Sequence, residues 1–419
     1  MEEWKEYRLS EIGTIVGGAT PSTKNPSFYD GEIPWITPKD LTDWKEVYIS
    51  SGERSITMEG YNSSSCKLMP KGTVLFTSRA PIGYIAIAAN ELCTNQGFKS
   101  VVPNIELVDS EFLYYALLYN KNKIKALGSG TTFAEISGKV MASVVISLPE
   151  LATQKKIAAQ LSEIDDKIAV NRCICENLEA QAQALFKHWF IDFAPFKNGK
   201  FVESELGMIP EGWRVGTYSD IIQETISGDW GKEKAEGNYT HKVACIRGCD
   251  FQDVKMGLRG KTPERFILEK NYQSKHFEDK DVLVEISGGT ATVSTGRICP
   301  VSQLLIDKYE GDIVCTNFCR LVRPIKGFSS YLYYSWNYKY DHKVMFGYEN
   351  GTSGIKNFSI KDFSSREPLI LPELSALNEF ENIIDHIHTQ IQNCGSESAK
   401  LATLRDTLLP TLMSGQIKV

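Results

Sequence analysis

Apolar residues recur at alternating spacings of four and three along two long stretches of the chain. The first seam comprises Ile157, Leu161, Ile164, Ile168, Asn171, Cys175, Leu178, Ala182, Leu185 and Trp189. The second comprises Phe380, Ile384, Ile387, Ile391, Cys394, Ser398, Leu401, Arg405, Leu408 and Leu412. A repeat of 3.5 residues sustained over several heptads predicts helices that pack against another helix. The alternative is that each helix lies along its own domain.

The two stretches are copies of each other. Leu148-Pro149-Glu150-Leu151 opens the first and Leu371-Pro372-Glu373-Leu374 opens the second, so the spacing is 223 residues. The same spacing relates the later seam positions, such as Leu178 and Leu401. Solenoid repeats have periods of about 20–50 residues. The sequence therefore indicates a duplicated unit made of one domain and one helix.

The segments that precede the helices also correspond, but less strictly. Each contains short strand-like runs separated by turn residues. Val74–Ser78 answers Val282–Ile286, and Cys93–Gln96 answers Cys315–Phe318. The offset between such pairs grows from 208 to 223 residues. Because surface loops tolerate changes of length, we infer a kept framework with altered loops.

These patterns predict an α/β (α+β) protein with two similar globular domains separated by an antiparallel pair of long coiled-coil helices, related by a pseudo-two-fold axis. A parallel pair would require the linker to return the whole length of a helix, which its residues could barely span. The predicted segments are a first domain over 1–148, a helix over 149–192, a linker over 193–212, a second domain over 213–370 and a second helix over 371–419.

Composition places the chain among ordinary globular proteins. Of its 419 residues, 42% are hydrophobic and 23% are charged. No apolar run approaches the ~18 residues of a membrane-spanning helix, and the start of the chain lacks the pattern of a signal peptide. We therefore expect a cytoplasmic protein without a membrane partner. The ten cysteines fit a reducing compartment, and we interpret the pairs Cys245/Cys249 and Cys315/Cys319 as buried thiols, with no metal site.

The charge is distributed unevenly. The net charge is −6, yet residues 1–148 carry 14 basic and 16 acidic side chains, and residues 213–370 carry 22 and 20. The acidity lies in the helical segments and the linker. A nucleic-acid-binding face on either domain must therefore be local, with modest affinity for phosphate.

Motifs for catalysis are not recognisable. The run from Gly130 to Gly138-Lys139 has the wrong spacing for a P-loop, and Val140 stands where Ser or Thr should bind magnesium. Asn25-Pro26-Ser27-Phe28 lacks the second proline of an adenine methyltransferase motif. The six histidines form no HExxH motif. We expect no catalytic residues in this chain.

Three stretches carry a family resemblance. The Leu-Pro-x-Leu entry to the first helix is followed by Gln154, the helix ends in the run Leu185–Phe193, and Glu203–Trp213 precedes the second domain. In this order they resemble the specificity subunit of type I restriction-modification enzymes, along the whole chain. One departure is that Ala376-Leu377-Asn378 replaces Thr153-Gln154-Lys155 in the second copy. We expect this change to alter a local cap or a partner contact and to leave the fold intact.

The resemblance implies a non-catalytic subunit that binds double-stranded DNA. It implies two target-recognition domains, two modification subunits that use S-adenosylmethionine to methylate adenine, and two restriction subunits that use ATP and magnesium to translocate and cut DNA. No cofactor is expected in this chain. Because the two domains differ in sequence, we expect an asymmetric, bipartite recognition site with a fixed gap.

Candidate DNA contacts lie in loops beside the shared framework, where Arg or Lys can bind guanine and Gln or Asn can bind adenine in the major groove. In the first domain these are Lys39, Ser78, Arg79, Gln96, Lys99, Thr131 and Thr132. In the second they are Arg247, Ser287, Asn317, Arg320, Thr352, Ser353 and Lys356. Each could instead be a surface polar residue or a turn former.

Two other functions remain open at this point. The chain could be a non-enzymatic coiled-coil scaffold whose two domains bind protein or glycan. It could also be a self-sufficient methyltransferase or nuclease. Neighbouring genes for an adenine methyltransferase and a helicase-nuclease would favour the DNA-binding subunit over both.

Overall fold

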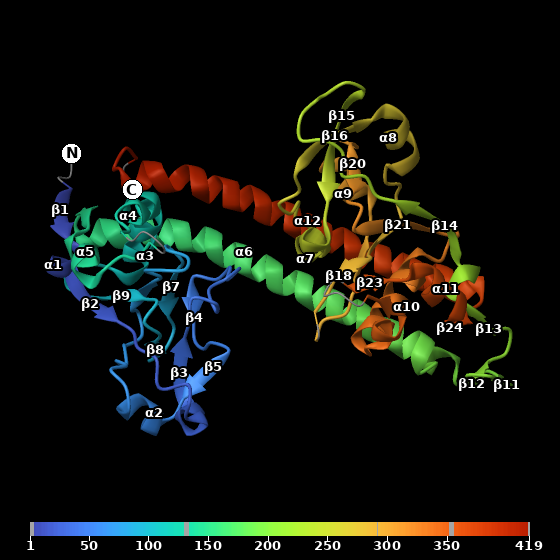
Figure 1. The fold of residues 1–419 in the computed structure, drawn as a ribbon, viewed down its shortest axis with the longest axis horizontal. Helices are drawn as coiled ribbons and strands as arrows, with labels where there is room; N and C mark the ends of the chain where they lie inside the picture. The colour runs from blue at the N-terminus through green and yellow to red at the C-terminus, as the bar shows by residue number, and fades with distance from the viewer. Residues whose placement is uncertain (1–3, 130–133, 291, 352–355, 418–419) are drawn as a thin grey trace. The chain divides into compact units, whose positions relative to one another are not determined.

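The heptad pattern folds into two long helices. In a computed structural model, which describes residues 4–129, 134–290, 292–351 and 356–417, they are α6 (Leu151–Phe186) and α12 (Leu374–Met413). A π-helical turn, η2 (Lys187–Ile191), extends the first. Every predicted seam position of both helices is buried or half-buried. The prediction of paired helices is confirmed, and Figure 1 draws them in green and red.

The chain divides into two compact units, and each contains part of both long helices. Unit 1 comprises residues 1–170 and 400–419, and unit 2 comprises residues 171–399. The boundaries thus cut through the helices, whereas the sequence segments treat each helix as a separate element. Each unit is described separately below.

The helices run antiparallel within each unit. In unit 1, the beginning of α6 packs on the end of α12 through Leu161 and Leu412, and Arg405 Nη1 lies 2.6 Å from Asp165 Oδ1. In unit 2, the order along the two helices is opposite. Asn171 Nδ2 donates to Glu397 Oε2 at 2.8 Å, and the ring of Phe186 packs against that of Phe380.

Unit 1 combines short strands with short helices. Its strands are β1 (Lys5–Arg8), β2 (Gly13–Gly17), β3 (Tyr29–Ile36), β4 (Tyr48–Ile49), β5 (Arg54–Ile56), β6 (Val74–Phe76), β7 (Ile85–Ala88), β8 (Cys93–Thr94), β9 (Lys99–Pro103) and β10 (Val145–Leu148). Its helices besides α6 and α12 are α1 (Leu9–Ile12), α2 (Met58–Asn62), α3 (Ser110–Tyr119), α4 (Lys121–Ala126) and α5 (Gly138–Ser143), with a 3-10 turn η1 (Pro26–Phe28).

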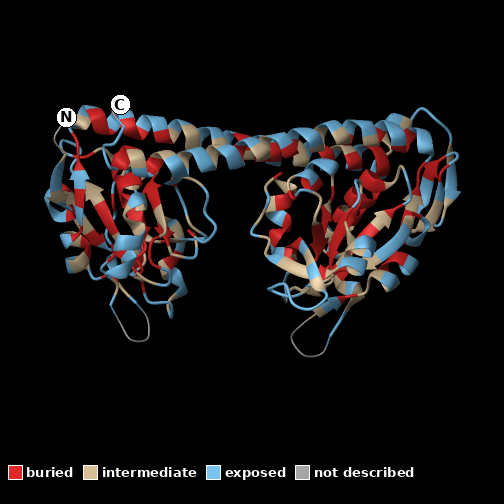
Figure 2. Cartoon of the chain, turned by 90° about the horizontal axis from the view of Figure 1, so that it is seen from above, coloured by how far each residue is buried: buried red, intermediate tan, exposed pale blue. Residues whose placement is uncertain are grey.

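Three sheets organise unit 1. The largest has the order β2-β9-β6-β7-β4, and β1 pairs with β10. A smaller sheet has the order β5-β3-β8, in which β3 pairs antiparallel with β5 and parallel with β8. The core joins the sheet residues Val74, Phe76 and Val101 to helix residues such as Phe112 and Leu161. Figure 2 shows these buried faces in red.

Unit 2 begins with a hairpin in the predicted linker. Its strands are β11 (Phe201–Ser204), β12 (Gly207–Pro210), β13 (Arg214–Thr217), β14 (Ile222–Ser227), β15 (Tyr239–Ile246), β16 (Glu264–Leu268), β17 (Val282–Glu285), β18 (Ser287–Gly288), β19 (Ile298–Pro300), β20 (Ile313–Cys315), β21 (Cys319–Pro324), β22 (Glu349–Asn350), β23 (Lys356–Phe358) and β24 (Pro368–Leu371). Its short helices are α7 (Phe251–Lys255), α8 (Glu269–Lys275), α9 (Gln303–Asp307), α10 (Ser329–Asp341) and α11 (Ile360–Arg366), with 3-10 turns η3 (Ala194–Phe196), η4 (Tyr218–Asp220), η5 (Gly248–Asp250) and η6 (Val344–Tyr348).

The sheets of unit 2 repeat those of unit 1. The order β14-β21-β17-β19 matches β2-β9-β6-β7, and the pair β13–β24 matches β1–β10. The order β16-β15-β20 matches β5-β3-β8, again with one antiparallel and one parallel neighbour. The duplication inferred from sequence is therefore a duplication of topology, and the α/β prediction is confirmed.

No helix within the described residues combines the length and the apolar composition needed to cross a membrane.

The two copies differ where the sequence departs from the family pattern. In unit 1, Gln154 is buried beneath the start of α3, where its Oε1 accepts from Asp109 N at 3.0 Å and its Nε2 donates to Leu107 O and Pro149 O. At the corresponding place Leu377 is buried in unit 2. One turn further along α12, the carboxylate of Glu381 accepts from Ser330 N at 3.0 Å. The support for the helix that follows the sheet has moved by one turn.

This arrangement predicts the effect of Gln154→Leu, which copies the residue of the second unit. Three buried backbone groups lose their partner, so we expect the free energy of unfolding to fall by about 2 kcal/mol or more. The measurement is denaturant or thermal unfolding of the full chain. Gln160→Leu changes an exposed glutamine of the same helix in the same way, and we expect a change within about 0.5 kcal/mol. Equal effects of both substitutions would contradict the assignment.

Candidate nucleic-acid interface

The central strand of the small sheet in unit 1 ends in a turn held by a carboxylate. Strand β3 ends at Ile36, and Asp40 Oδ2 accepts from Thr37 N at 2.7 Å and from Thr37 Oγ1 at 2.6 Å. Asp40 Oδ1 accepts from Glu53 N at 2.7 Å. The carboxylate therefore joins the turn after β3 to the segment that leads into β5.

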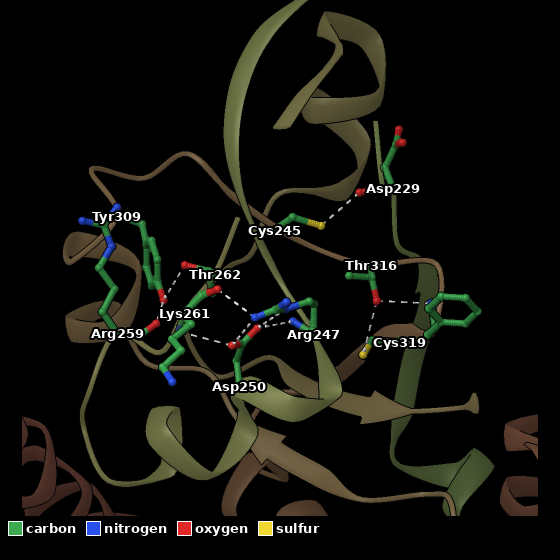
Figure 3. Close-up of polar contacts among 11 residues, drawn as sticks. Asp229, Cys245, Arg247, Asp250, Arg259, Lys261, Thr262, Tyr309, Thr316 and Cys319 are labelled. Carbon is green, nitrogen blue, oxygen red and sulfur yellow. Dashed lines mark hydrogen bonds and ion pairs between the residues drawn. The ribbon is translucent and has the colours of Figure 1, made fainter. Parts of the chain in front are cut away.

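The same device occurs in unit 2. Strand β15 ends at Ile246, and Asp250 Oδ2 accepts from Arg247 N at 3.0 Å, while Oδ1 accepts from Lys261 N at 3.2 Å (Figure 3). Asp250 also binds the guanidinium of Arg247, with Nε–Oδ2 and Nη2–Oδ1 distances of 2.9 and 3.0 Å. Asp250 is buried, and the carboxylate raises the pKa of Arg247. The turns after β3 and β15 are therefore equivalent.

Parallel pairing brings a second turn beside the first. The carboxyl ends of two parallel strands lie at the same edge of a sheet, so the turn after β8 lies next to the turn after β3. Asn95 N donates to Ile36 O at 2.9 Å in unit 1, and Thr316 N donates to Ile246 O at 3.0 Å in unit 2.

A third turn, which follows the central strand of the large sheet, completes the arrangement. Ser78 N donates to Gly97 O at 2.7 Å, and Ile286 N donates to Phe318 O at 2.9 Å. These bonds make Ser78 equivalent to Ile286 and Gly97 equivalent to Phe318. We call the three turns together the turn edge of each unit. It comprises residues 37–40, 78–79 and 95–99 in unit 1, and residues 247–250, 286–287 and 317–320 in unit 2.

The turn edge of unit 1 contains every described candidate contact of that unit. Arg79 Nη1 and Lys99 Nζ each lie 3.7 Å from the carboxylate of Glu135, so two cations from different turns face one anion. Arg79 pairs with Glu135 in an isolated antiparallel bridge. The three side chains form one charged group with a net charge of +1.

The other three candidates of unit 1 differ in exposure. Lys39 is exposed, and its Nζ lies 2.6 Å from Glu53 Oε2. Gln96 is also exposed and accepts a hydrogen bond from Thr20 Oγ1. Ser78 is fully buried, and its hydroxyl donates to Gly97 O at 3.1 Å. Ser78 therefore supports the edge from within, and Lys39 and Gln96 present polar groups to solvent.

Three candidates of unit 2 lie in the turns themselves. Arg247 Nη2 donates to Lys261 O at 2.7 Å as well as to Asp250, so its guanidinium braces the first turn. Asn317 is exposed at the tip of the second turn. Arg320 begins β21, and its Nη1 donates to Asn317 O and Cys319 O, both at 3.0 Å.

Two further candidates lie on neighbouring strands of a small sheet. Ser287 in β18 faces Asn357 in β23, and Gly288 faces Lys356. Lys356 Nζ lies 2.8 Å from Glu349 Oε2 and above the ring of Phe346. Burial opposes ionisation of Glu349, but hydrogen bonds from Lys356 and Thr295 hold the pKa of its carboxyl below its usual value. Lys356 is therefore paired with a charged group.

The comparisons agree with this geometry. A family model described as the type I restriction modification DNA specificity domain matches residues 1–180. The chain is 34% identical to the type I restriction enzyme MjaIX specificity subunit of Methanocaldococcus jannaschii, over 100% of this chain and 94% of that protein. It is 23% identical to the HindI specificity subunit of Haemophilus influenzae, over 100% of both.

A solved structure has the same fold. The type I restriction-modification system S subunit from M. genitalium matches with a TM-score of 0.55 and 15% identity, over 98% of this chain and 96% of that one. The identity and coverage of the Methanocaldococcus relative decide the family. The chain belongs to the specificity subunits of type I restriction enzymes.

Four candidate contacts of this specificity subunit, Thr131, Thr132, Thr352 and Ser353, lie outside the described residues.

Sequence reasoning missed the acidic members of the turn edge and one aromatic residue. Asp40 and Asp250 hold the first turn, and Glu135 and Glu349 face the basic candidates. Aligning Ile36-Thr37-Pro38-Lys39-Asp40 with Ile246-Arg247-Gly248-Cys249-Asp250 would have found the two aspartates, which are 210 residues apart. Phe318, which is exposed in the second turn, had no counterpart in unit 1 to mark it.

The carboxylate of Asp250 allows a direct test of the first turn. In Asp250→Ala the amides of Arg247 and Lys261 lose their acceptor, and a mostly buried ion pair loses one member, so we expect unit 2 to lose about 3 kcal/mol. Amide hydrogen exchange should show lost protection at Arg247 and Lys261. The turn after β3 in unit 1 is the internal control and should exchange as in the wild type. Unchanged protection at both unit 2 amides would show that Asp250 does not hold the turn.

Proposed function

We propose that the turn edge of each unit contacts base edges in the major groove, so that the chain recognises a bipartite DNA sequence for a type I restriction-modification complex. The observation that carries this proposal is the duplicated edge. Its hydrogen-bonded frame is the same in both units, whereas the side chains that it presents differ. Thr37 corresponds to Arg247, and Arg79 to Ser287.

Differing side chains on equal frames support an asymmetric site. Arg can donate two hydrogen bonds to guanine, whereas Ser can serve either kind of base. Each unit would therefore read a different half-site. Both long helices contribute residues to both units, which supports a gap of fixed length between the half-sites.

Catalysis in this proposal belongs to partner subunits. Two modification subunits would bind S-adenosylmethionine and methylate adenine, and two restriction subunits would use ATP and magnesium to translocate and cut DNA. The chain itself would be non-catalytic and cytoplasmic. The ten unpaired cysteines support a reducing compartment, and the relatives named above are specificity subunits.

The decisive experiment maps methylated adenines across the host genome with and without this gene. We expect one asymmetric motif, with two short specified parts and a constant gap, to lose methylation when the gene is deleted. The purified chain, given DNA and labelled S-adenosylmethionine, should transfer no methyl groups. A motif that persists after deletion, or methyl transfer by the chain alone, would refute the proposal.

Arg79 separates the two half-sites. Arg79→Ala should weaken discrimination at one base pair of the unit 1 half-site by about 1–3 kcal/mol and leave the other half-site unchanged. The measurement is the affinity of the assembled complex for DNA with single base changes in each half-site. Lys71→Ala is the matched control, because Lys71 is exposed near the opposite end of strand β6. A uniform loss across all sequences would mean that Arg79 contacts phosphate.

A further inference from the structure

Phe318 is an apolar side chain among the polar candidates of the turn edge. It is 65% exposed, which makes it the most exposed aromatic residue within the described parts of the chain. Single exposed apolar residues are common on protein surfaces and need no explanation by themselves. The position of Phe318 between Asn317 and Arg320 distinguishes it, because both neighbours are candidate base contacts.

The backbone around Phe318 is held on both sides. Phe318 N donates to Thr316 Oγ1 at 3.3 Å, and Phe318 O accepts from Ile286 N at 2.9 Å. Cys319 N donates to Thr316 O at 2.9 Å, and Thr316 Oγ1 also lies 3.8 Å from Cys319 Sγ (Figure 3). Thr316 and Cys319 are both buried. The turn thus fixes the point from which the ring projects, and little ordering entropy would remain to be lost on binding.

The polar neighbours are arranged around the same turn. Arg320 Nη1 donates to the carbonyl oxygens of Asn317 and Cys319, which places its guanidinium beside the base of the turn. Asn317 is exposed at its tip. A ligand that satisfies Asn317 and Arg320 would therefore meet the ring of Phe318 at the same time.

Unit 1 has no equivalent of this ring. Gly97 occupies the matching position, and a side chain there would meet Pro38, whose Cγ would lie 2.7 Å from an added Cβ. In unit 2, Gly248 stands where unit 1 has Pro38. The exchange of a proline for a glycine in the first turn opens the space above the second turn, so Phe318 is a feature of one unit only.

We propose that Phe318 contacts the 5-methyl group of a thymine in the half-site read by unit 2. This inference rests on the proposed function. The thymine methyl is the one apolar group on the major-groove edges of the four base pairs, and Phe is one of the side chains that can contact it. A phenyl ring offers no hydrogen bond to phosphate, so its contribution depends on sequence. Unit 2 would thereby require a T·A pair at one defined position.

The test replaces each thymine of that half-site, one at a time, by deoxyuridine, which removes only the methyl group. The probe is the mapped target duplex, and the readout is its affinity for the chain assembled with its modification subunits. For the wild type we expect a loss of about fourfold at one thymine, as for burial of one methylene-sized group. Phe318→Ala should bind the thymine duplex several-fold more weakly and should show no further loss with deoxyuridine at that position.

Ile325→Ala is the matched control, because Ile325 is an exposed apolar residue directly after the opposite end of strand β21. This variant should keep the fourfold sensitivity. Three outcomes would overturn the inference: a unit 2 half-site without thymine, a Phe318→Ala variant that keeps the deoxyuridine effect, or loss of subunit assembly in Phe318→Ala while the control assembles. Failure of the proposed function is distinct, since the wild-type complex would then not distinguish the mapped duplex from unrelated DNA.

Discussion

The turn edge depends on one constraint, the parallel pairing of two short strands whose ends must both be satisfied. Ile36 O accepts from Asn95 N in unit 1, as Ile246 O accepts from Thr316 N in unit 2. Beyond these bonds, the exposed amides of the first turn would lack partners, and a carboxylate four residues after the strand end supplies them. Loops are mobile unless such bonds hold them. A binding surface made of three loops becomes defined because each loop is tied to the next.

The same constraint explains how the two copies diverged. Hydrogen bonds between backbone groups do not depend on side-chain identity, so the frame persists while Thr37 faces Arg247 and Gly97 faces Phe318 in the alignment of the units. The strict 223-residue register belongs to the helices, where a seam tolerates no slip. Substitution at the edge changes which chemical groups are presented, and it leaves the topology of the unit unaltered.

The sequence predicted the helices, their seam and the duplicated domains, because periodicity and repeat spacing are read directly from residues such as Leu161 and Ile384. It also selected candidate positions that the fold brings to one edge, including Arg79 and Lys99. It could not show that Ser78 is buried, because a serine after a strand is equally compatible with either side. Nor could it show Glu135 between two cations, since that contact joins residues more than 35 positions apart in the chain.

The acidic partners have a consequence for recognition. Arg79 and Lys99 face Glu135, and Lys356 faces Glu349, so the basic side chains of the edge are neutralised in part before DNA arrives. Binding to phosphate alone would give up these pairs for contacts that salt screens. A correctly placed guanine, which offers two acceptors in fixed geometry, compensates for the loss better than a single phosphate oxygen can. The carboxylates thus weaken binding to unrelated DNA more than binding to the target, and they raise specificity at the expense of affinity.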